Sequence, residues 1–155
     1  TIDPVCRSDS RILILGSFPS VRSREAGFYY AHPSNRFWKI MAALFCTSLP
    51  DIESRRTFLL ANRIALWDTI GRCTIKGSSD SSIEDAEPND ISLLIKETDI
   101  STIMLNGRKS ESIFRKFHPD FNDADVIAMP STSAANASYS LQDLIDAWSI
   151  ITSLL

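Results

Sequence analysis

The chain is poor in cysteine and has no long hydrophobic run. Its three cysteines are an odd number without Cys-x-x-Cys spacing, and they stand at Cys6, Cys46 and Cys73. This pattern argues against a disulfide framework, a zinc site and an iron–sulfur cluster. The cysteine pattern therefore favours a reducing, cytoplasmic setting. No apolar stretch approaches the roughly 20 residues that a membrane-spanning helix needs, so no membrane partner is expected.

The chain also lacks the short motifs of several common enzyme classes. It contains no Walker phosphate loop, no Gly-x-Gly-x-x-Gly, no Gly-x-Ser-x-Gly nucleophile elbow and no His-Glu-x-x-His. Each of these motifs carries a defined chemistry, from phosphate binding to metal-assisted hydrolysis. Any activity must therefore be read from other features.

An excess of positive charge is missing as well, which argues mildly against nucleic-acid binding. The net charge is −3, whereas nucleic-acid-binding domains usually present a basic surface. The distribution weakens this objection, because residues 1–80 carry eleven Lys and Arg against seven Asp and Glu, and residues 81–155 carry five against twelve. Four basic residues flank one aromatic-rich segment, namely Arg22, Arg24, Arg36 and Lys39. A solvated surface without a partner is the alternative interpretation.

The pattern of apolar residues predicts one α/β domain spanning residues 1–155. The length suffices for a real core, and 44% of the residues are hydrophobic. Short apolar runs predict strands over residues 12–15, 64–70, 102–105 and 125–128. Helical spacing and caps predict helices over residues 35–45, 51–62, 90–98, 110–117 and 140–154. We expect surface loops over residues 72–89 and 130–139. The alternation predicts a parallel sheet covered on both faces, a three-layer α/β/α sandwich with a four-stranded parallel sheet.

Three loops leave predicted strands at the same edge of this sheet, over residues 16–18, 106–107 and 130–132. Ligands of parallel sheets bind beyond the carboxyl ends of the strands. The segment GFYYAHPSNRFW, residues 27–38, follows the first strand and is rich in aromatic rings. Aromatic faces stack on nucleobases, which contributes about 1–3 kcal/mol per base. The sequence therefore predicts a base-binding pocket at this edge, which Asp68 could also reach.

Four blocks of the chain resemble the uracil-DNA glycosylase superfamily. They are GSFPS, FYYAHPSNRFW, IMLNG and MPSTSAAN, which begin at Gly16, Phe28, Ile103 and Met129. The HPSNRFW block resembles mismatch-specific uracil/thymine glycosylases, and GSFPS with PSTSAAN resembles the hypoxanthine-DNA (deoxyinosine) glycosylases more. The resemblance implies an enzyme that flips a damaged base out of DNA and cleaves its bond to deoxyribose. It also implies a four-stranded parallel sheet and chemistry without a metal or cofactor.

The resemblance assigns roles to single residues. Tyr30 stands at the stacking position, and Phe18 would form a second wall. Phe18 also marks a departure, because most of the superfamily has Asp or Asn there to position water; Met129 likewise stands where uracil enzymes have a histidine. In the hypoxanthine branch the asparagine of the HPxN segment is the proposed catalytic residue, which here is Asn35. The remaining expected site residues are Gly16 and Ser17, whose N–H groups would stabilise charge on the base, and Asn106, which would read the base edge.

A second set of residues is expected to contact DNA. Ser131, Thr132 and Ser133 would approach phosphates, and Ala135 and Asn136 would enter the gap that the flipped base leaves. Simpler interpretations stay open for other positions. Asn35 could be a helix cap, and Asn106 could form a turn. His32 could be a structural histidine rather than a general acid or a phosphate ligand. Asp80 could be a solvated loop acid rather than a carboxylate of the site.

The sequence therefore predicts a monofunctional DNA glycosylase of base excision repair, acting as a monomer on DNA with a damaged or mispaired base. Hypoxanthine is the favoured base. No lysine in the four blocks is placed as a Schiff-base nucleophile, so simple hydrolysis without strand nicking is expected. The alternatives are a mismatch-specific uracil/thymine glycosylase, a non-catalytic nucleic-acid or nucleotide binding module, and an unrelated α/β protein whose aromatic segment is only core.

Overall fold

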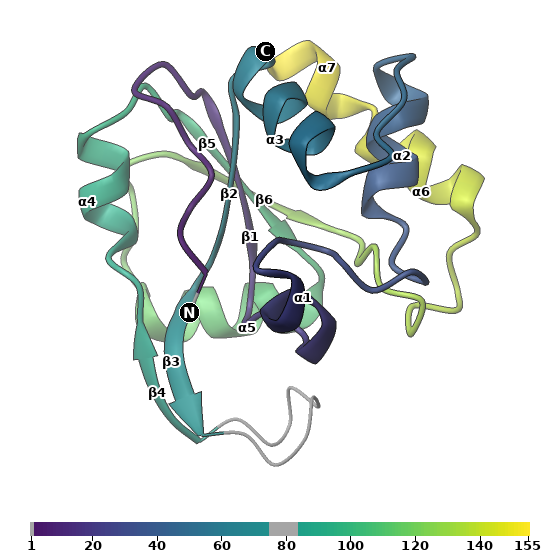
Figure 1. Cartoon of the computed structure of the whole chain (residues 1–155). Coiled ribbons are helices and arrows are strands. Elements are labelled where there is room, and N and C mark those ends of the chain that lie inside the picture. Colours follow the sequence, from purple (N-terminus) through teal and green to yellow (C-terminus); the bar gives the residue numbers. More distant parts are fainter. Residues whose placement is uncertain (1, 75–83) are drawn as a thin grey trace.

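A parallel sheet forms the centre of the protein. The structure is a computed structural model, and it describes residues 2–74 and 84–155. Four strands lie in the order β2-β1-β5-β6 and are all parallel (Figure 1). Their bounds are β1 (Ile12–Gly16), β2 (Ile64–Asp68), β5 (Thr102–Asn106) and β6 (Asp125–Met129). The two central strands, β1 and β5, are buried along their apolar runs, which is why they read as continuous hydrophobic stretches.

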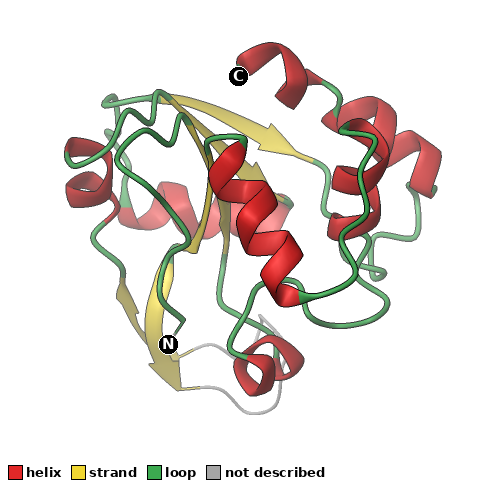
Figure 2. Ribbon diagram, turned by 45° about the horizontal axis from the view of Figure 1, so that its top comes forward, coloured by secondary structure: helices red, strands yellow, loops and turns green. Residues whose placement is uncertain are grey.

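Helices cover both faces of the sheet (Figure 2). They are α1 (Val21–Ala26), α2 (Phe37–Leu44), α3 (Ile52–Ala61), α4 (Ile91–Lys96), α5 (Arg108–Phe117), α6 (Leu141–Trp148) and α7 (Ile150–Leu154). Alternate residues of β1 point to opposite faces. Ile12 and Ile14 pack in a core with α2, α3, α6 and α7, while Leu13 and Leu15 pack in a second core with α4 and α5. These two cores confirm the predicted three-layer sandwich.

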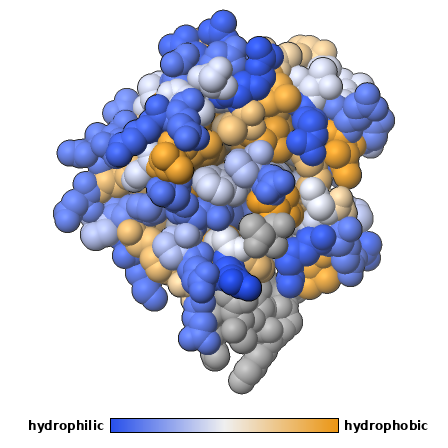
Figure 3. All heavy atoms as spheres, turned by 60° about the vertical axis from the view of Figure 1, so that its left-hand side comes forward, coloured by the Kyte–Doolittle hydropathy of each residue, from blue (hydrophilic) through white to orange (hydrophobic). Residues whose placement is uncertain are grey.

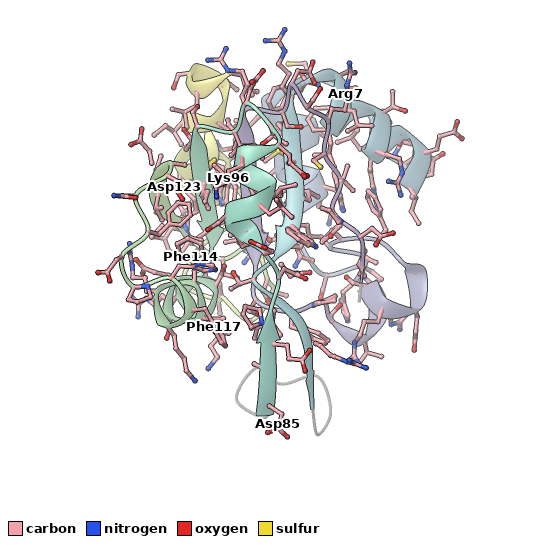
Figure 4. The ribbon with its side chains drawn as sticks, turned by 90° about the vertical axis from the view of Figure 1, so that its left-hand side faces the viewer. Arg7, Asp85, Lys96, Phe114, Phe117 and Asp123 are labelled. Carbon is pink, nitrogen blue, oxygen red and sulfur yellow. The ribbon has the colours of Figure 1, made fainter. Side chains whose placement is uncertain are left out.

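The region after β2 differs from the sequence prediction. The predicted strand over residues 64–70 ends at Asp68, and the predicted loop over residues 72–89 contains strands of its own. These are β3 (Ile70–Thr74) and β4 (Glu84–Pro88), which form a separate antiparallel ribbon. The register of this ribbon shifts twice, so its residues show no regular alternation to detect. Asp85, exposed near the outer end of the ribbon, lies far from the sheet (Figure 4).

Two helices also differ in extent from the prediction. Helix α1 was not expected; it begins after Ser20, whose Oγ accepts a hydrogen bond from the Ser23 N–H. The predicted helix over residues 140–154 is divided at Ser149, whose hydroxyl donates to the Asp146 carbonyl oxygen. Such local bonds of serine compete with the helical pattern. The other predicted helices are confirmed, with ends that shift by about two residues.

The surface seen in Figure 3 is mainly hydrophilic, with apolar side chains scattered between polar ones. Within the described ranges, no helix combines the length and the apolar character that crossing a membrane requires.

Candidate active site

A pocket of about 460 Å³ opens at the carboxyl ends of the strands, where the loop between α1 and α2 also lies (Figure 1). Its size falls within the range of small-molecule sites. The pocket gathers most of the residues predicted from the sequence, which are Gly16, Ser17, Phe18, Tyr30, His32, Asn35, Asn106, Ser131, Thr132, Ser133 and Ala135. A larger hollow of about 650 Å³ beside α3 contains none of them.

Two predicted residues are not among the described residues that line this pocket. Asn136 lines a neighbouring hollow, which Gly107 also lines. Ser131, Ser133 and Ala135 line both this hollow and the pocket. Asp80 lies outside the described residues.

The ring of Tyr30 packs against α2. It stacks on the fully buried ring of Phe37, with the ring centres 4.3 Å apart and the planes 23° apart. Tyr30 has a φ of 52°, in the left-handed region that costs a non-glycine residue about 1–3 kcal/mol. The hydrogen bond from the Trp38 indole N–H to the carbonyl oxygen of Tyr29 helps to hold this backbone. A specific, costly backbone conformation therefore directs Tyr30 to the pocket.

Asp68 adds a buried carboxylate to this pocket. It ends β2 directly opposite Gly16 of β1, and only 7% of it is exposed. Burial, and then the charge of Asp68, raise the pKa of the Tyr30 hydroxyl, while a hydrogen bond with Asn106 opposes the rise. Tyr30 therefore keeps its proton at neutral pH and can donate a hydrogen bond.

Phe18 and Arg24 lie together near the carboxyl end of β1. Phe18 is half-buried and lines the pocket, and the guanidinium carbon of Arg24 lies 5.4 Å from the centre of its ring. A cation over an aromatic face is attracted by the ring quadrupole. The carbonyl oxygens of Gly16 and Ser17 accept hydrogen bonds from the N–H groups of Thr69 and Ile70, which fixes the turn after β1.

Asn35 stands in a hydrogen-bonded chain that connects three segments. Its Oδ1 accepts from the backbone N–H of Phe37 at 3.0 Å and from the hydroxyl of Thr132 at 2.8 Å. Thr132 is buried, and it is bonded twice to Asn106: Asn106 Nδ2 donates to its Oγ1, and its backbone N–H donates to Asn106 Oδ1, both at 3.1 Å. Asn35 Oδ1 thus accepts from the N–H of the first residue of α2, but Asn35 is not the helix cap of its simpler interpretation, because the N-cap is Arg36 and no side chain makes a cap hydrogen bond there.

Arg36 holds the loop over residues 131–139. Its guanidinium donates to four backbone carbonyl oxygens, those of Thr132, Ser133, Asn136 and Tyr139, at 2.6–3.4 Å. The sequence suggested a basic surface residue here. Arg36 is instead a clamp, because the planar fork of its guanidinium matches several carbonyl groups at once.

The loop that Arg36 holds is also bonded internally. The Oγ atoms of Ser131 and Ser133 accept from the N–H groups of Ser133 and Ala135, and the side-chain amide of Asn136 donates to the carbonyl oxygen of Ser131. A serine that accepts in this way still has its own hydroxyl proton to donate. Phosphate contact by these serines stays a prediction.

His32 lies exposed on the pocket wall. Its Nδ1 accepts from the backbone N–H of Ser34 at 3.1 Å and lies 2.7 Å from the Ser34 hydroxyl. Because a backbone N–H can only donate, Nδ1 carries no proton, and the other ring nitrogen, Nε2, holds it. In the described part of the chain, no three His, Cys, Asp or Glu side chains lie close enough to hold a metal ion.

Comparison with known proteins gives one consistent result. The model of the uracil DNA glycosylase superfamily matches residues 4–151. A hypoxanthine DNA glycosylase of Methanosarcina acetivorans is 35% identical over 142 residues, which cover 88% of this chain and 87% of that protein. A hypoxanthine DNA glycosylase of Methanosarcina barkeri is 34% identical over 110 residues, 69% of this chain and 70% of that protein.

A solved structure agrees with these relatives. The solution NMR structure of a candidate uracil DNA glycosylase from Methanosarcina acetivorans superposes with a TM-score of 0.79 at 32% identity, and the match covers 99% of this chain and 96% of that one. The family match over nearly the whole chain and the relatives of similar length show that this chain belongs to the uracil DNA glycosylase superfamily.

Proposed function

We propose that this protein excises hypoxanthine from DNA by hydrolysis and so starts base excision repair. The coarser statement, that it is a DNA glycosylase of the uracil DNA glycosylase superfamily, follows from its family and relatives. The finer statement is carried by one observation: the pocket joins an aromatic ring, a buried carboxylate and an asparagine carboxamide, contributed by Tyr30, Asp68 and Asn35. The two relatives described above as hypoxanthine DNA glycosylases support the same base.

The carboxylate of Asp68 suits the change in hydrogen bonding that deamination makes in a base. When adenine becomes hypoxanthine, the ring nitrogen N1 changes from a hydrogen-bond acceptor to an N–H donor. A carboxylate accepts hydrogen bonds from such a donor and repels the lone pair of undamaged adenine. Cytosine undergoes the corresponding change at N3 when it becomes uracil, so Asp68 alone does not separate the two deaminated bases.

Phe18 favours the purine. Most of the superfamily has Asp or Asn at this position, and a phenyl ring can neither orient water nor accept a proton. The ring offers apolar area to a base that stacks beside Tyr30, and a purine gains more from such stacking area than a pyrimidine does. Extrusion of the base costs a few kcal/mol, and less at a mispair, which itself favours damaged sites.

The cleavage step would be a simple hydrolysis. No lysine is among the described residues that line the pocket, so nothing there supports a Schiff-base intermediate or strand nicking. We propose that the hydroxyls of Ser131 and Ser133 meet the phosphates and that Ala135 and Asn136 face the gap in the duplex. The protein would act as a monomer on DNA that contains the damaged or mispaired base.

A panel of labelled duplexes tests this function. Duplexes with inosine, uracil or a thymine mispair are incubated with the protein, and abasic sites are detected by alkaline cleavage. Abasic product mainly from inosine supports the proposal, and product mainly from uracil or thymine supports a mismatch-specific uracil/thymine glycosylase. Retention of DNA at low salt without any abasic product would indicate a binding module, because phosphate contacts are strongest there.

A further inference from the structure

The orientation of the Asn35 carboxamide follows from two donors. The backbone N–H of Phe37 can only donate, so the atom of Asn35 that faces it is the oxygen, Oδ1. The same reasoning orients Asn106, because its Oδ1 faces the backbone N–H of Thr132. Asn106 Nδ2 then donates to the Thr132 hydroxyl oxygen, and the proton of that hydroxyl is directed to Asn35 Oδ1. The chain of bonds therefore has one direction, from Asn106 through Thr132 to Asn35.

With this direction of the chain of bonds, the Asn35 side chain can only donate hydrogen bonds to a ligand. A carbonyl oxygen has two lone pairs, and both lone pairs of Asn35 Oδ1 are used, by Phe37 and by Thr132. No described residue forms a hydrogen bond with Asn35 Nδ2, and Asn35 is partly exposed on the pocket wall. The group that Asn35 presents to a bound ligand is thus an N–H donor.

We infer that Asn35 donates a hydrogen bond to the departing base, and that Thr132 and Asn106 are the residues that position it. The inference rests on the proposed excision of hypoxanthine. In that reaction the bond between N9 and C1′ breaks, its electron pair stays with the base, and the water oxygen bonds to C1′. One proton of the water finally reaches the base, which leaves as neutral hypoxanthine beside an abasic sugar.

A donor is useful at the moment when the base becomes negative. The charge spreads over the purine, whose N3 and N7 are acceptors in the plane of the ring. A preorganised N–H that meets one of them stabilises the transition state more than the ground state. Asn35 cannot take the proton of the attacking water, because both of its acceptor sites are occupied. The Asn35 oxygen is likewise not available to hold a water molecule, so contact with the leaving group is the catalytic role that we infer for Asn35.

Asn35→Asp separates the two roles. The aspartate retains an oxygen for Phe37 and Thr132 but has no N–H to donate when ionised. If Asn35 donates, removing the donor slows single-turnover release of hypoxanthine by about 10²–10³-fold at neutral pH. The ratio of the variant's rate to the wild-type rate then rises about tenfold for each pH unit of acidification above the variant carboxyl's pKa, because the protonated carboxyl donates again. In acid the variant also exceeds Asn35→Ala.

Other outcomes overturn the inference. The inference fails if Asn35→Asp releases hypoxanthine at or above the wild-type rate at neutral pH, or if the ratio of the two rates does not rise in acid. It also fails if Asn35→Asp is no faster than Asn35→Ala in acid. Asn35 would then act only by holding water or by bonding the first turn of α2. If the wild type itself releases no hypoxanthine, the proposed function fails instead, so the two failures are distinguishable. Thermal unfolding of both variants checks that the fold remains.

The positioning role of Thr132 has its own test. Thr132→Val removes the hydroxyl with little change in volume, and Thr132→Ser retains it. We expect Thr132→Val to lower kcat about tenfold, the equivalent of one hydrogen bond, with little change in KM, while Thr132→Ser restores most of the rate. The effects of Thr132→Val and Asn35→Ala should not add, because both act through one contact. Equal rates for the Val and Ser variants, or additive effects, would contradict the positioning role.

Discussion

Gly16 and Asp68 approach each other so closely that a side chain at Gly16 would displace the Asp68 carboxylate. A methyl group placed on Gly16 would lie 2.5 Å from Asp68 Oδ1, a distance that real Cβ atoms essentially never show, and 3.7 Å from the Tyr30 hydroxyl oxygen. Gly16 also ends β1 at the residue paired with Asp68 of β2. The missing side chain of Gly16 therefore makes room for the carboxylate at the edge of the pocket.

The first prediction concerns this contact. Gly16→Ala should displace the Asp68 carboxylate and lower the rate of hypoxanthine release, with a loss of about 1–3 kcal/mol in the free energy of unfolding from overpacking. Rates are measured on inosine duplexes and stability by urea unfolding. Asp68→Ala removes the obstacle, so the stability loss from Gly16→Ala should shrink in the double variant. An equal loss in both backgrounds would show that the two residues are not coupled.

Asp68 itself provides the second prediction. Asp68→Asn replaces a charged acceptor with a neutral one, and hydrogen bonds to charged groups contribute about 1.5–3 kcal/mol. We expect kcat/KM on inosine duplexes to fall by about 10–100-fold. Unchanged kcat/KM on inosine would contradict the assignment of Asp68 to the base edge.

The same variant has a spectroscopic control. Burial, and then the charge of Asp68, raise the pKa of both Tyr29 and Tyr30, so removal of that charge lowers both pKa values while the larger effect of burial remains. Phenolate absorbance measured during an alkaline titration should therefore rise at lower pH in Asp68→Asn than in wild type. This readout reports on the geometry of the pocket independently of activity.

Much of the architecture could be predicted from the chain, because buried parallel strands require continuous apolar runs and capped helices require recognisable side chains. The rule that ligands bind beyond strand carboxyl ends likewise brought Gly16, Tyr30 and Asn106 together. The ribbon of β3 and β4 escaped prediction because its register shifts twice, so its residues show no regular alternation.

The internal geometry of the site was beyond sequence reasoning. Asn35 and Thr132 are 97 positions apart, and nothing in either residue reveals that they share a hydrogen bond. Likewise, the closeness of Asp68 to Gly16 depends on the exact register of β1 against β2. Such pairings are consequences of packing, so they become visible only in three dimensions.

A third prediction tests the stacking surface at Tyr30. Tyr30→Ala removes the ring, and stacking on a base contributes about 1–3 kcal/mol. The variant should therefore release hypoxanthine about 5–150-fold more slowly at subsaturating enzyme, whereas Tyr30→Phe retains the ring and loses only the hydroxyl. Thermal unfolding of both variants accounts for the lost contact with Phe37. If Tyr30→Phe and Tyr30→Ala slow release equally, the hydroxyl rather than the ring face is the important feature.

The last prediction concerns the clamp at Arg36, which connects α2 to the loop over residues 131–139. Arg36→Lys retains the charge but not the planar fork, so it should fail to hold the four carbonyl groups and behave nearly like Arg36→Ala. Both variants should lose about 1–3 kcal/mol of stability and show faster proteolysis within the loop, since hydrogen bonds of charged donors are lost. Lys39→Ala, which removes an exposed cation one turn along the same segment, is the matched control for charge. If Lys39→Ala weakens DNA retention and loop protection as much as Arg36→Ala, then charge and not the clamp governs the loop.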